Sequence, residues 1–416
     1  MLLEFSINNF KSFKNKTTFS MEKGVGDELE NNYFSTSAGD VLKVASMFGP
    51  NASGKSNFMR AFTAAIMMVR NSNINQPGTK NVYYDPFAFE NKTDKKDDLI
   101  EFEFIILIGS IKYFYSFAYD ETKIVSEKLV AYYSQKPTTV FARENVYEYK
   151  FITEDQKQLT EILKKNTDNK LFLSTATNWN YSKTKPVFDW FMEGIDTYSS
   201  FEHLPNTPSD SLISYKRDDK DLKEFALKVL KEADFQITDY SIKVHEVQVD
   251  AARIGGPAGV LVPIQQLEVQ MKHEIENENG EIQEYSLNLL KESNGTQNIF
   301  HLIPKLKRAF DCSRVLVVDE IEKSLHPSII EYIIKLFNDK EINKYNSQLI
   351  FSTHNLLLLN SNKLRRDQYW FADKDYKTGI SEIYSLDEFK IRKDDRRLKN
   401  YLNGRYGAIP YIDLGD

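Results

Sequence analysis

A short glycine-containing segment, MFGPNASGKSNF at residues 47–58, most strongly constrains how this chain can fold. It separates Gly49 from Gly54 by four residues and places Lys55 and Ser56 directly after the second glycine. This spacing is typical of a loop whose backbone N–H groups surround phosphate oxygens, while the lysine supplies charge and the serine binds magnesium. The flanking VLKVASMF predicts a buried strand, and SNFMRAFTAAIMMVR predicts an amphipathic helix. The sequence therefore predicts a nucleotide site.

The composition limits the class of protein in which this site can lie. The chain has 416 residues, 41% of them hydrophobic, so it can bury a substantial core in two or three lobes. Its formal net charge of -6 gives no general attraction to nucleic acid, and its single cysteine excludes an internal disulfide framework. No apolar run approaches the roughly 20 residues of a membrane helix, and the N-terminus lacks a signal-peptide core. We therefore expect a cytoplasmic protein with no membrane contact.

Hydrophobic patterning divides the chain into three expected segments. Residues 1–150 hold the glycine loop and alternating stretches that predict antiparallel strands. Residues 151–238 space their apolar side chains by three and four, which predicts a helical insertion. Residues 239–416 return to strands, with a hairpin turn at Asn279 and Gly280, and end in alternating strands and helices. The predicted fold class is α/β.

Two carboxylates follow a second expected buried strand. In SRVLVVDEIEKSLHP, four apolar residues directly precede Asp319 and Glu320. Ligands of an open parallel sheet bind at the carboxyl ends of its strands, so Asp319 is placed to hold magnesium and Glu320 to orient or deprotonate water. A further strand in SQLIFSTHN ends at Thr353 and His354, which brings His354 within reach of a γ-phosphate. Each feature alone is common, so the prediction rests on their combination.

A fourth motif, SNGTQ, begins at Ser293 just before an expected helix and resembles the Leu-Ser-Gly-Gly-Gln signature of ABC-type ATPases. Together, the motifs make the chain resemble the RecF- and SMC-like branch of these ATPases. Within that branch it is similar to the RloA and AbiL type (AAA family) of abortive-infection and phage-defence ATPases. Five passages carry the resemblance: FSINNFKSF, FGPNASGKSN, KESNGTQ, VVDEIEKSLHP and FSTHN.

The resemblance implies an ABC-ATPase head, made of a P-loop NTPase sheet with an antiparallel β subdomain, together with the helical insertion. It implies ATP and Mg²⁺ as cofactors, with Ser56 and Asp319 at the metal, Glu320 as catalytic base and His354 sensing the γ-phosphate. The signature of one head would serve the ATP of a second copy, which implies a homodimer or higher oligomer. A glutamine that links the metal to the moving lobe is not evident, and Gln76 and the segment YYDPFAFE are the candidates. The implied nucleotide-binding residues are Gly49, Asn51, Ser53, Gly54, Lys55, Ser56 and Asn57, and the implied signature residues are Ser293, Asn294 and Gly295.

Three functions remain open from the sequence. The first is the ATP-dependent sensor or switch of an anti-phage system, which controls a separate effector such as a nuclease. The alternative is a RecF-like DNA repair or recombination ATPase that acts directly on nucleic acid. A small-molecule kinase would fit the glycine loop but leaves SNGTQ, SLHP and STHN unexplained.

Two features near the C-terminus bear on the choice between these functions. Asp373 and Asp375 resemble the metal-binding pair of Toprim nucleases, although a solvated loop is the simpler interpretation. The tail FKIRKDDRRLKNYLNGRYG is basic and includes Tyr401 and Tyr406, so it could contact nucleic acid or an acidic partner.

Overall fold

The computed structural model describes the chain except for residues 90–97, 200–209, 216–218, 234, 255–256, 391–395 and 411–416. Its internal contacts form two compact units. Unit 1 consists of Met1–Thr197, Cys312–Ile321 and Ile333–Asp416, and unit 2 consists of Tyr198–Asp311 and Glu322–Tyr332. The chain therefore leaves unit 1 twice and returns to it twice, so each unit combines segments that are far apart in sequence.

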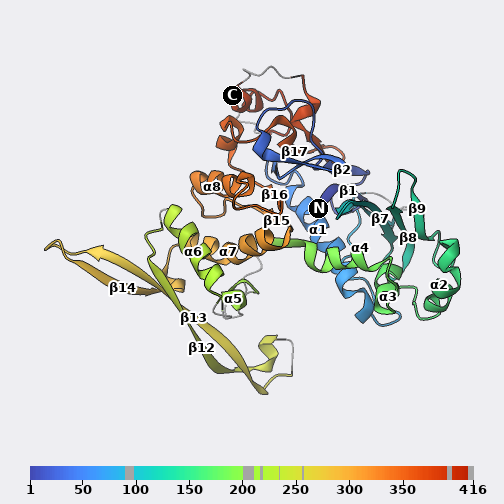
Figure 1. The fold of residues 1–416 in the computed structure, drawn as a ribbon, viewed down its shortest axis with the longest axis horizontal. Coiled ribbons are helices and arrows are strands. Elements are labelled where there is room, and N and C mark those ends of the chain that lie inside the picture. The colour runs from blue at the N-terminus through green and yellow to red at the C-terminus, as the bar shows by residue number, and fades with distance from the viewer. Residues whose placement is uncertain are drawn as a thin grey trace. The chain divides into compact units, whose positions relative to one another are not determined.

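A six-stranded, mostly parallel sheet forms one layer of unit 1 (Figure 1). Its strands are β5 (Val44–Phe48), β11 (Ile195–Ser199), β15 (Val315–Asp319), β16 (Gln348–Ser352), β17 (Tyr369–Lys374) and β18 (Ser381–Ser385). Their order is β11-β15-β16-β5-β17-β18, in which β15, β16, β5 and β17 pair in parallel and β18 pairs antiparallel with β17. Every residue of β5, β15 and β16 is buried, which is typical of a parallel sheet covered on both faces.

A seven-stranded antiparallel sheet forms the second layer of unit 1. Its strands are β1 (Leu2–Asn8), β2 (Thr17–Ser20), β6 (Ile100–Ile108), β7 (Ile111–Tyr119), β8 (Ile124–Tyr132), β9 (Thr138–Arg143) and β10 (Tyr149–Phe151). Their order is β10-β9-β8-β7-β6-β1-β2. Along most of β6, buried residues alternate with half-buried ones, as expected for a strand with one face on the core. A separate small hairpin joins β3 (Tyr33–Thr36) to β4 (Gly39–Leu42).

Helix α1 (Lys55–Asn71) connects the two layers. It contacts β15 and β16 of the parallel sheet, while Phe58 and Phe62 pack against Phe5 of the antiparallel sheet. The Phe5 and Phe62 ring centroids are 4.0 Å apart. Because Phe58, Phe62 and Ile66 are four residues apart, they share one face of the helix, and all three are buried. The helix that begins at the glycine loop is thus held firmly in the core.

Helices occupy much of the segment expected to be a helical insertion. Helices α2 (Gln156–Leu163), α3 (Phe172–Asn178) and α4 (Lys185–Asp189) belong to unit 1, and a π-helical turn, Trp190–Gly194, follows them. Helices α5 (Asp210–Tyr215) and α6 (Lys220–Glu232) belong to unit 2. The division into residues 1–150, 151–238 and 239–416 stays a prediction. The internal contacts group the chain differently, into two units.

Unit 2 combines helices with a three-stranded sheet. The strands are β12 (Asp239–Asp250), β13 (Leu261–Glu276) and β14 (Ile282–Asn288), paired antiparallel in that order. Helix α7 (Asn294–Cys312) follows them, and α8 (Pro327–Asn338) begins in this unit and ends in unit 1. The core stacks Tyr215 on Phe300 with ring centroids 4.3 Å apart, and Tyr240 packs edge-on against both rings. The expected turn at Gly280 joins β13 to β14, with φ of 78° at the glycine.

The predicted fold class is confirmed. The glycine loop joins β5 to α1 in a parallel sheet, and an antiparallel sheet packs on the same helix. A last helix, α9 (Arg397–Leu402), lies near the C-terminus. None of the helices within the described ranges is long and apolar enough to cross a bilayer.

Candidate nucleotide site

Both glycines of the loop are required by its geometry. Gly49 has φ of 150° and Gly54 has φ of 116°, values that residues with a side chain rarely adopt. A Cβ at Gly49 would lie 2.3 Å from the carbonyl oxygen of Ala372, and one at Gly54 would lie 2.7 Å from Ser381 Oγ. The neighbouring β17–β18 hairpin therefore packs directly on the loop and leaves room for glycine alone.

The inside of the loop holds two buried polar side chains. Ser53 is 1% exposed, and within the described part of the chain its hydroxyl has no hydrogen-bond partner. Lys55 is 4% exposed, and its Nζ donates to the carbonyl oxygens of Gly49 at 2.8 Å and Pro50 at 2.9 Å. A buried hydroxyl without a partner is costly, and a phosphate oxygen would satisfy it. The loop therefore fits a phosphate-binding role.

The remaining loop residues predicted for the site differ in where they lie. Asn51 is exposed at the tip of the loop, whereas Asn57 is half-buried on α1. The Asn57 side-chain amide donates to Ser12 Oγ at 2.9 Å, and the Ser12 carbonyl accepts a hydrogen bond from the Ser381 N–H. Asn57 thus ties the loop helix to the segment between β1 and β2.

Asp319 lies at the carboxyl end of β15, where it meets the first turn of α1. Its Oδ1 accepts hydrogen bonds from Ser56 Oγ at 3.3 Å and from Ser352 Oγ at 2.5 Å. Ser352 Oγ also accepts the backbone N–H of Glu320 at 2.7 Å. Asp319 is 8% exposed and Ser352 is fully buried. One hydroxyl from the neighbouring strand therefore orients the side chain of Asp319 and the backbone of Glu320 together.

This donor set suits magnesium. A carboxylate and a serine hydroxyl are hard oxygen ligands, and Mg²⁺ is usually held by one or two such groups together with water and substrate phosphates. Ser56 and Asp319 are already close enough for a hydrogen bond between their side chains. They are the two residues that would hold the ion.

Glu320 and His354 lie at the same sheet edge because β5, β15 and β16 run in parallel. Glu320 is half-buried and adopts φ of 51°, an uncommon left-handed conformation for a glutamate. His354 is exposed and follows Thr353, whose N–H donates to the Met47 carbonyl at 2.9 Å. Both side chains therefore leave the sheet next to the loop.

The predicted signature lies in unit 2, at the start of α7. Ser293 Oγ accepts the N–H of Thr296 at 3.1 Å, so Ser293 caps the helix. Ser293 and Asn294 are exposed, while Gly295 is buried, and a Cβ there would lie 2.5 Å from the Ser324 carbonyl oxygen. The structure gathers the loop and carboxylate residues in unit 1, and the signature residues form a separate group.

Gln76 has a different environment from the one expected of a metal-linking glutamine. It is exposed, and its backbone carbonyl accepts the Asn169 side-chain amide at 2.6 Å and the Thr79 hydroxyl at 2.8 Å. Its described contacts stabilise a turn after α1.

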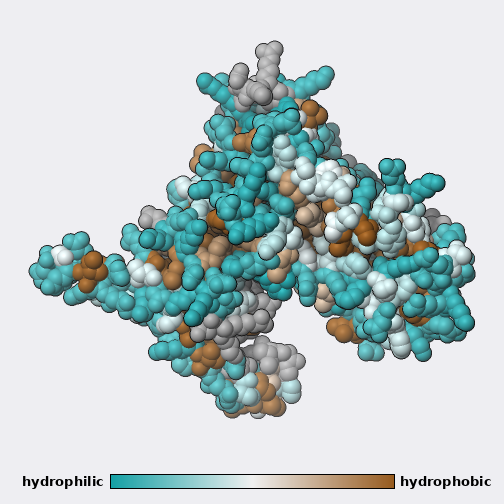
Figure 2. Space-filling view, viewed as in Figure 1, coloured by the Kyte–Doolittle hydropathy of each residue, from teal (hydrophilic) through white to brown (hydrophobic). Residues whose placement is uncertain are grey.

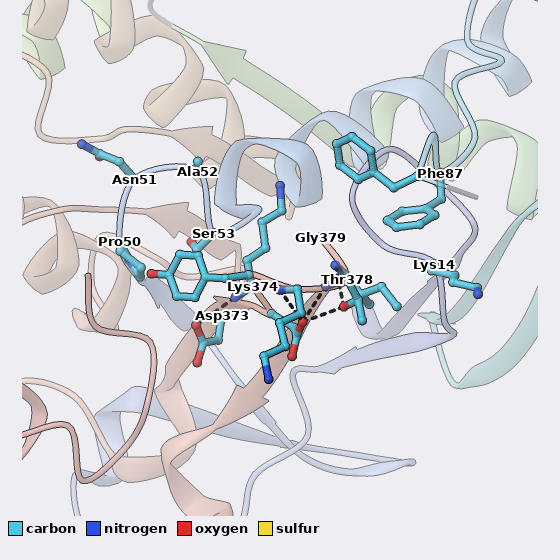
Figure 3. Close-up of a pocket in the computed structure, with 15 residues that line it drawn as sticks. Lys14, Pro50, Asn51, Ala52, Ser53, Phe87, Asp373, Lys374, Thr378 and Gly379 are labelled. Carbon is cyan, nitrogen blue, oxygen red and sulfur yellow. Dashed lines mark hydrogen bonds between the residues drawn. The ribbon is translucent and has the colours of Figure 1, made fainter. Parts of the chain in front are cut away.

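A cavity of about 640 Å³ opens beside the loop (Figure 3). Figure 3 shows the loop residues Pro50 to Ser53 on one side, with Lys14 and Phe87 on the other. Phe89 also lines the cavity and is 70% exposed. Aromatic and cationic side chains beside a phosphate loop are groups that a nucleoside could contact.

The acidic pair, Asp373 and Asp375, lines the same cavity and is engaged in local structure. Asp373 Oδ1 accepts the Lys374 N–H at 2.8 Å, and its Oδ2 accepts the Ala408 N–H at 2.9 Å. Asp375 Oδ1 accepts the Lys377 N–H and both donors of Thr378. Hydrogen bonds, first from the Thr378 N–H, lower the pKa of the Asp375 carboxyl. In the described ranges, no group of three or more His, Cys, Asp or Glu side chains that could hold a metal ion occurs.

The tyrosines of the basic tail face the protein interior. Tyr401 and Tyr406 are 2% and 1% exposed, and both rings stack on Phe371. Arg397 lies over the ring of Tyr369 and donates to the Leu364 carbonyl. These rings offer no surface on which a base could stack.

Ser352 is the site residue that sequence patterns missed, although FSTHN places it directly before Thr353. We expect Ser352→Ala to lower turnover about 10–100-fold, the usual effect of removing a group that orients a metal ligand. It should also raise the magnesium concentration needed for half-maximal rate, because Asp319 loses its shortest hydrogen bond. A magnesium titration of ATPase rate measures both.

Ser46→Ala is the matched control for Ser352→Ala. Ser46 is equally buried on the adjacent strand β5, and its hydroxyl donates to the Gln368 carbonyl at 2.9 Å, away from the carboxylates. If both variants shift the magnesium requirement equally, the effect belongs to sheet packing and the positioning role is wrong.

Comparison with known proteins gives a family and several similar structures. A family model described as "AAA domain, putative AbiEii toxin, Type IV TA system" matches residues 44–360. The chain is similar to the SMC head domain from Thermotoga maritima, with TM-score 0.41 and 12% identity over 94% of this chain and 99% of that one. It is also similar to an Smc head domain with a coiled coil and joint from Pyrococcus yayanosii, with TM-score 0.40 and 10% identity over 97% and 99%. A third, from Pyrococcus furiosus, is an Smc head domain with an extended coiled coil bound to the C-terminal domain of ScpA, with TM-score 0.38 and 11% identity over 93% and 97%. No curated protein sequence matches the chain.

Proposed function

The chain is an ATPase that belongs to the AAA-domain family matched over residues 44–360, and we propose that it acts in a bacterial anti-phage system. In this proposal the chain is the ATP-dependent switch of that system. ATP would bind between two heads of a homodimer, and the open and closed dimers would control a separate effector, such as a nuclease. The family description names a toxin of a toxin–antitoxin system, which supports a defence role of the abortive-infection type.

The observation that carries the catalytic part of the proposal is the hydrogen-bonded group of Ser56, Asp319 and Ser352 beside the glycine loop. Lys55 would place its charge at the β- and γ-phosphates once it releases the loop carbonyls. Glu320 would accept a proton from the attacking water, and His354 would contact the γ-phosphate. When bound, Mg²⁺ would neutralise developing phosphate charge, with Ser56 and Asp319 as its protein ligands.

The dimer part of the proposal rests on the exposed start of α7. Ser293 and Asn294 are exposed at a helix N-terminus, whose N–H groups and dipole favour an anion. The glycine loop, residues 49–56, belongs to unit 1, whereas the start of α7 belongs to unit 2. The phosphate for this helix would come from a second copy of the chain.

Ser293→Arg is expected to leave ATP binding to the isolated subunit unchanged and to prevent ATP-dependent dimerisation and turnover. The bulky charge would clash with the partner's nucleotide. Loss of the helix cap alone costs about 1 kcal/mol. Light scattering with and without ATP measures the dimer, and calorimetry measures binding.

The control for this prediction is Ser110→Arg, which adds the same side chain at the exposed turn between β6 and β7. An ATP-dependent dimer that forms equally with Ser293→Arg would rule out the signature assignment.

We assign the effector to another chain, and the backbone hydrogen bonds that engage Asp373 and Asp375 support this assignment. We expect the purified chain to hydrolyse ATP and to leave DNA and RNA intact in the presence of magnesium or manganese. Incubation of wild-type and Lys55→Ala protein with both nucleic acids tests this. Cleavage that persists in Lys55→Ala but is lost when Asp373 and Asp375 become Ala would make this chain the effector.

ATP can change effector binding only as far as the effector's affinities for the open and the closed dimer differ. A pull-down of neighbouring gene products with Glu320→Gln protein, with and without ATP, tests this coupling. Equal recovery in both conditions would contradict the switch.

A further inference from the structure

Strand β14 and the end of β13 form a hairpin arm, residues 270–288, at one end of the sheet of unit 2. Strand β13 pairs with β12 over residues 261–272 and with β14 over residues 270–276. Only three residues of β13 therefore have a neighbour on both sides. Figure 1 shows β14 and the end of β13 extending away from α6 and α7.

The two faces of the hairpin arm differ in composition: one holds most of its apolar side chains together with His273 and Gln283, and the other holds most of its charged side chains. Directly opposite residues share a face, and successive residues alternate, so the register puts Ile275, Tyr285 and Leu287 on one side. These three side chains are 44%, 51% and 36% exposed. Figure 2 shows hydrophobic atoms exposed on this arm among hydrophilic ones. The opposite face carries Lys272, Glu274, Glu276 and Glu284, and also Ile282, which is 71% exposed. Lys272 Nζ lies 3.2 Å from Glu284 Oε1, so Glu274 and Glu276 are the two carboxylates of this face that a basic segment would meet first.

The outer edge of β14 is unpaired among the described strands. The β13–β14 register has no shift over its seven pairs, and β14 contains no proline. The unpaired backbone N–H and C=O groups of an edge strand can bind another strand. Native edge strands therefore often contain a β-bulge or a proline, which blocks further pairing. This edge lacks both, and it is long enough for an added strand.

The negative charge of the arm determines which kind of strand could pair with the edge of β14. The arm carries five exposed glutamates, Glu274, Glu276, Glu278, Glu281 and Glu284, against one lysine, Lys272. A second copy of the arm would bring like charges together, whereas a basic segment would be attracted. We propose that the edge of β14 binds an extended, basic segment of a partner protein as a fourth strand. Apolar side chains of that segment would pack on Tyr285 and Leu287, and alternate lysines or arginines would face the glutamates.

This inference rests on the proposed function in one respect, since the partner it fits is the separate effector. None of the residues assigned to the nucleotide, the metal or the signature lies within the arm, residues 270–288. The two proposals can therefore fail independently.

The test measures binding of two fluorescent peptides to the full chain by anisotropy: four repeats of Lys-Val and four repeats of Glu-Val. We expect the Lys-Val peptide to bind at least about tenfold tighter, and added salt to weaken it, because exposed charges are screened. Tyr285→Lys combined with Leu287→Lys should weaken the Lys-Val peptide about tenfold or more. Replacing Glu274, Glu276 and Glu284 by Lys should reverse the preference toward the Glu-Val peptide.

The control is Val82→Lys combined with Tyr147→Lys, two apolar positions in unit 1 that are 86% and 74% exposed, more than Tyr285 and Leu287. It should bind the Lys-Val peptide like the wild type. Peptide binding should persist in Lys55→Ala protein. ATP hydrolysis should persist in the arm variants, and circular dichroism checks that these variants keep their helix content. Equal binding of both peptides, or unchanged binding after the arm changes, would overturn the inference, as would self-association that the arm changes abolish.

Discussion

Glu320→Gln is expected to keep ATP binding while lowering hydrolysis about 10²–10⁴-fold, the usual contribution of a general base. The amide can still orient a water molecule but cannot accept its proton. The backbone of Glu320 is held by Ser352 through its N–H, so the substitution leaves that hydrogen bond in place. With ATP and magnesium, the variant should accumulate as a dimer. Phosphate release measures the rate, and light scattering measures the dimer.

Glu382→Gln is the control for the loss of a carboxylate from the same sheet. Glu382 is exposed on β18, and its substitution removes the same charge. Hydrolysis by Glu320→Gln at the wild-type rate would exclude Glu320 as the base, whereas equal losses in both variants would indicate a general effect of charge.

The parts of this site that sequence could predict are those encoded by neighbouring residues. A buried strand, a glycine loop and a helix follow one another in residues 44–71, and each leaves its own periodicity. Asp319 likewise ends a fully buried strand, and Glu320 follows it. Their meeting with the loop could be expected because parallel strands present their carboxyl ends at one edge.

The parts that sequence could not predict depend on contacts between distant segments. Ser352 is 33 residues from Asp319, and only strand pairing makes its hydroxyl the shared partner of Asp319 and Glu320. The need for Gly49 likewise comes from Ala372, on a strand that pairs with β5. The spacing of residues along the sequence does not predict such contacts.

The same limit explains the acidic pair and the division into units. A pattern of Asp-Lys-Asp does not reveal whether the carboxylates meet a cation or backbone N–H groups, and Asp373 bonds to Ala408, 35 residues away. Residues 322–332 begin two positions after Glu320 yet belong to unit 2, where Lys323 and Ser324 lie beside the start of α7. Periodicity identifies elements, whereas their assignment to units depends on packing.

Lys55→Ala should weaken ATP binding by about 10²-fold or more. Removing one partner of a buried charge pair costs about 3–5 kcal/mol, because the other charge is left desolvated and unpaired, and this corresponds to roughly 10²–10⁴-fold in Kd. In the free protein the Lys55 ammonium group already donates to the carbonyls of Gly49 and Pro50. When ATP binds, these two hydrogen bonds are exchanged for contacts with phosphate, so the net gain in binding free energy from Lys55 is smaller than the full energy of the phosphate contacts. We therefore expect a loss nearer the lower end of that range.

Titration calorimetry with ATP and magnesium measures the loss in Lys55→Ala, and Lys128→Ala, an exposed lysine on β8, controls for net charge. Thermal unfolding without nucleotide separates binding from stability. Because Lys55 Nζ bonds two loop carbonyls, its removal should lower the unfolding temperature slightly and leave the core packing of α1 unchanged. An ATP affinity equal to that of the wild type would show that the phosphates bind elsewhere.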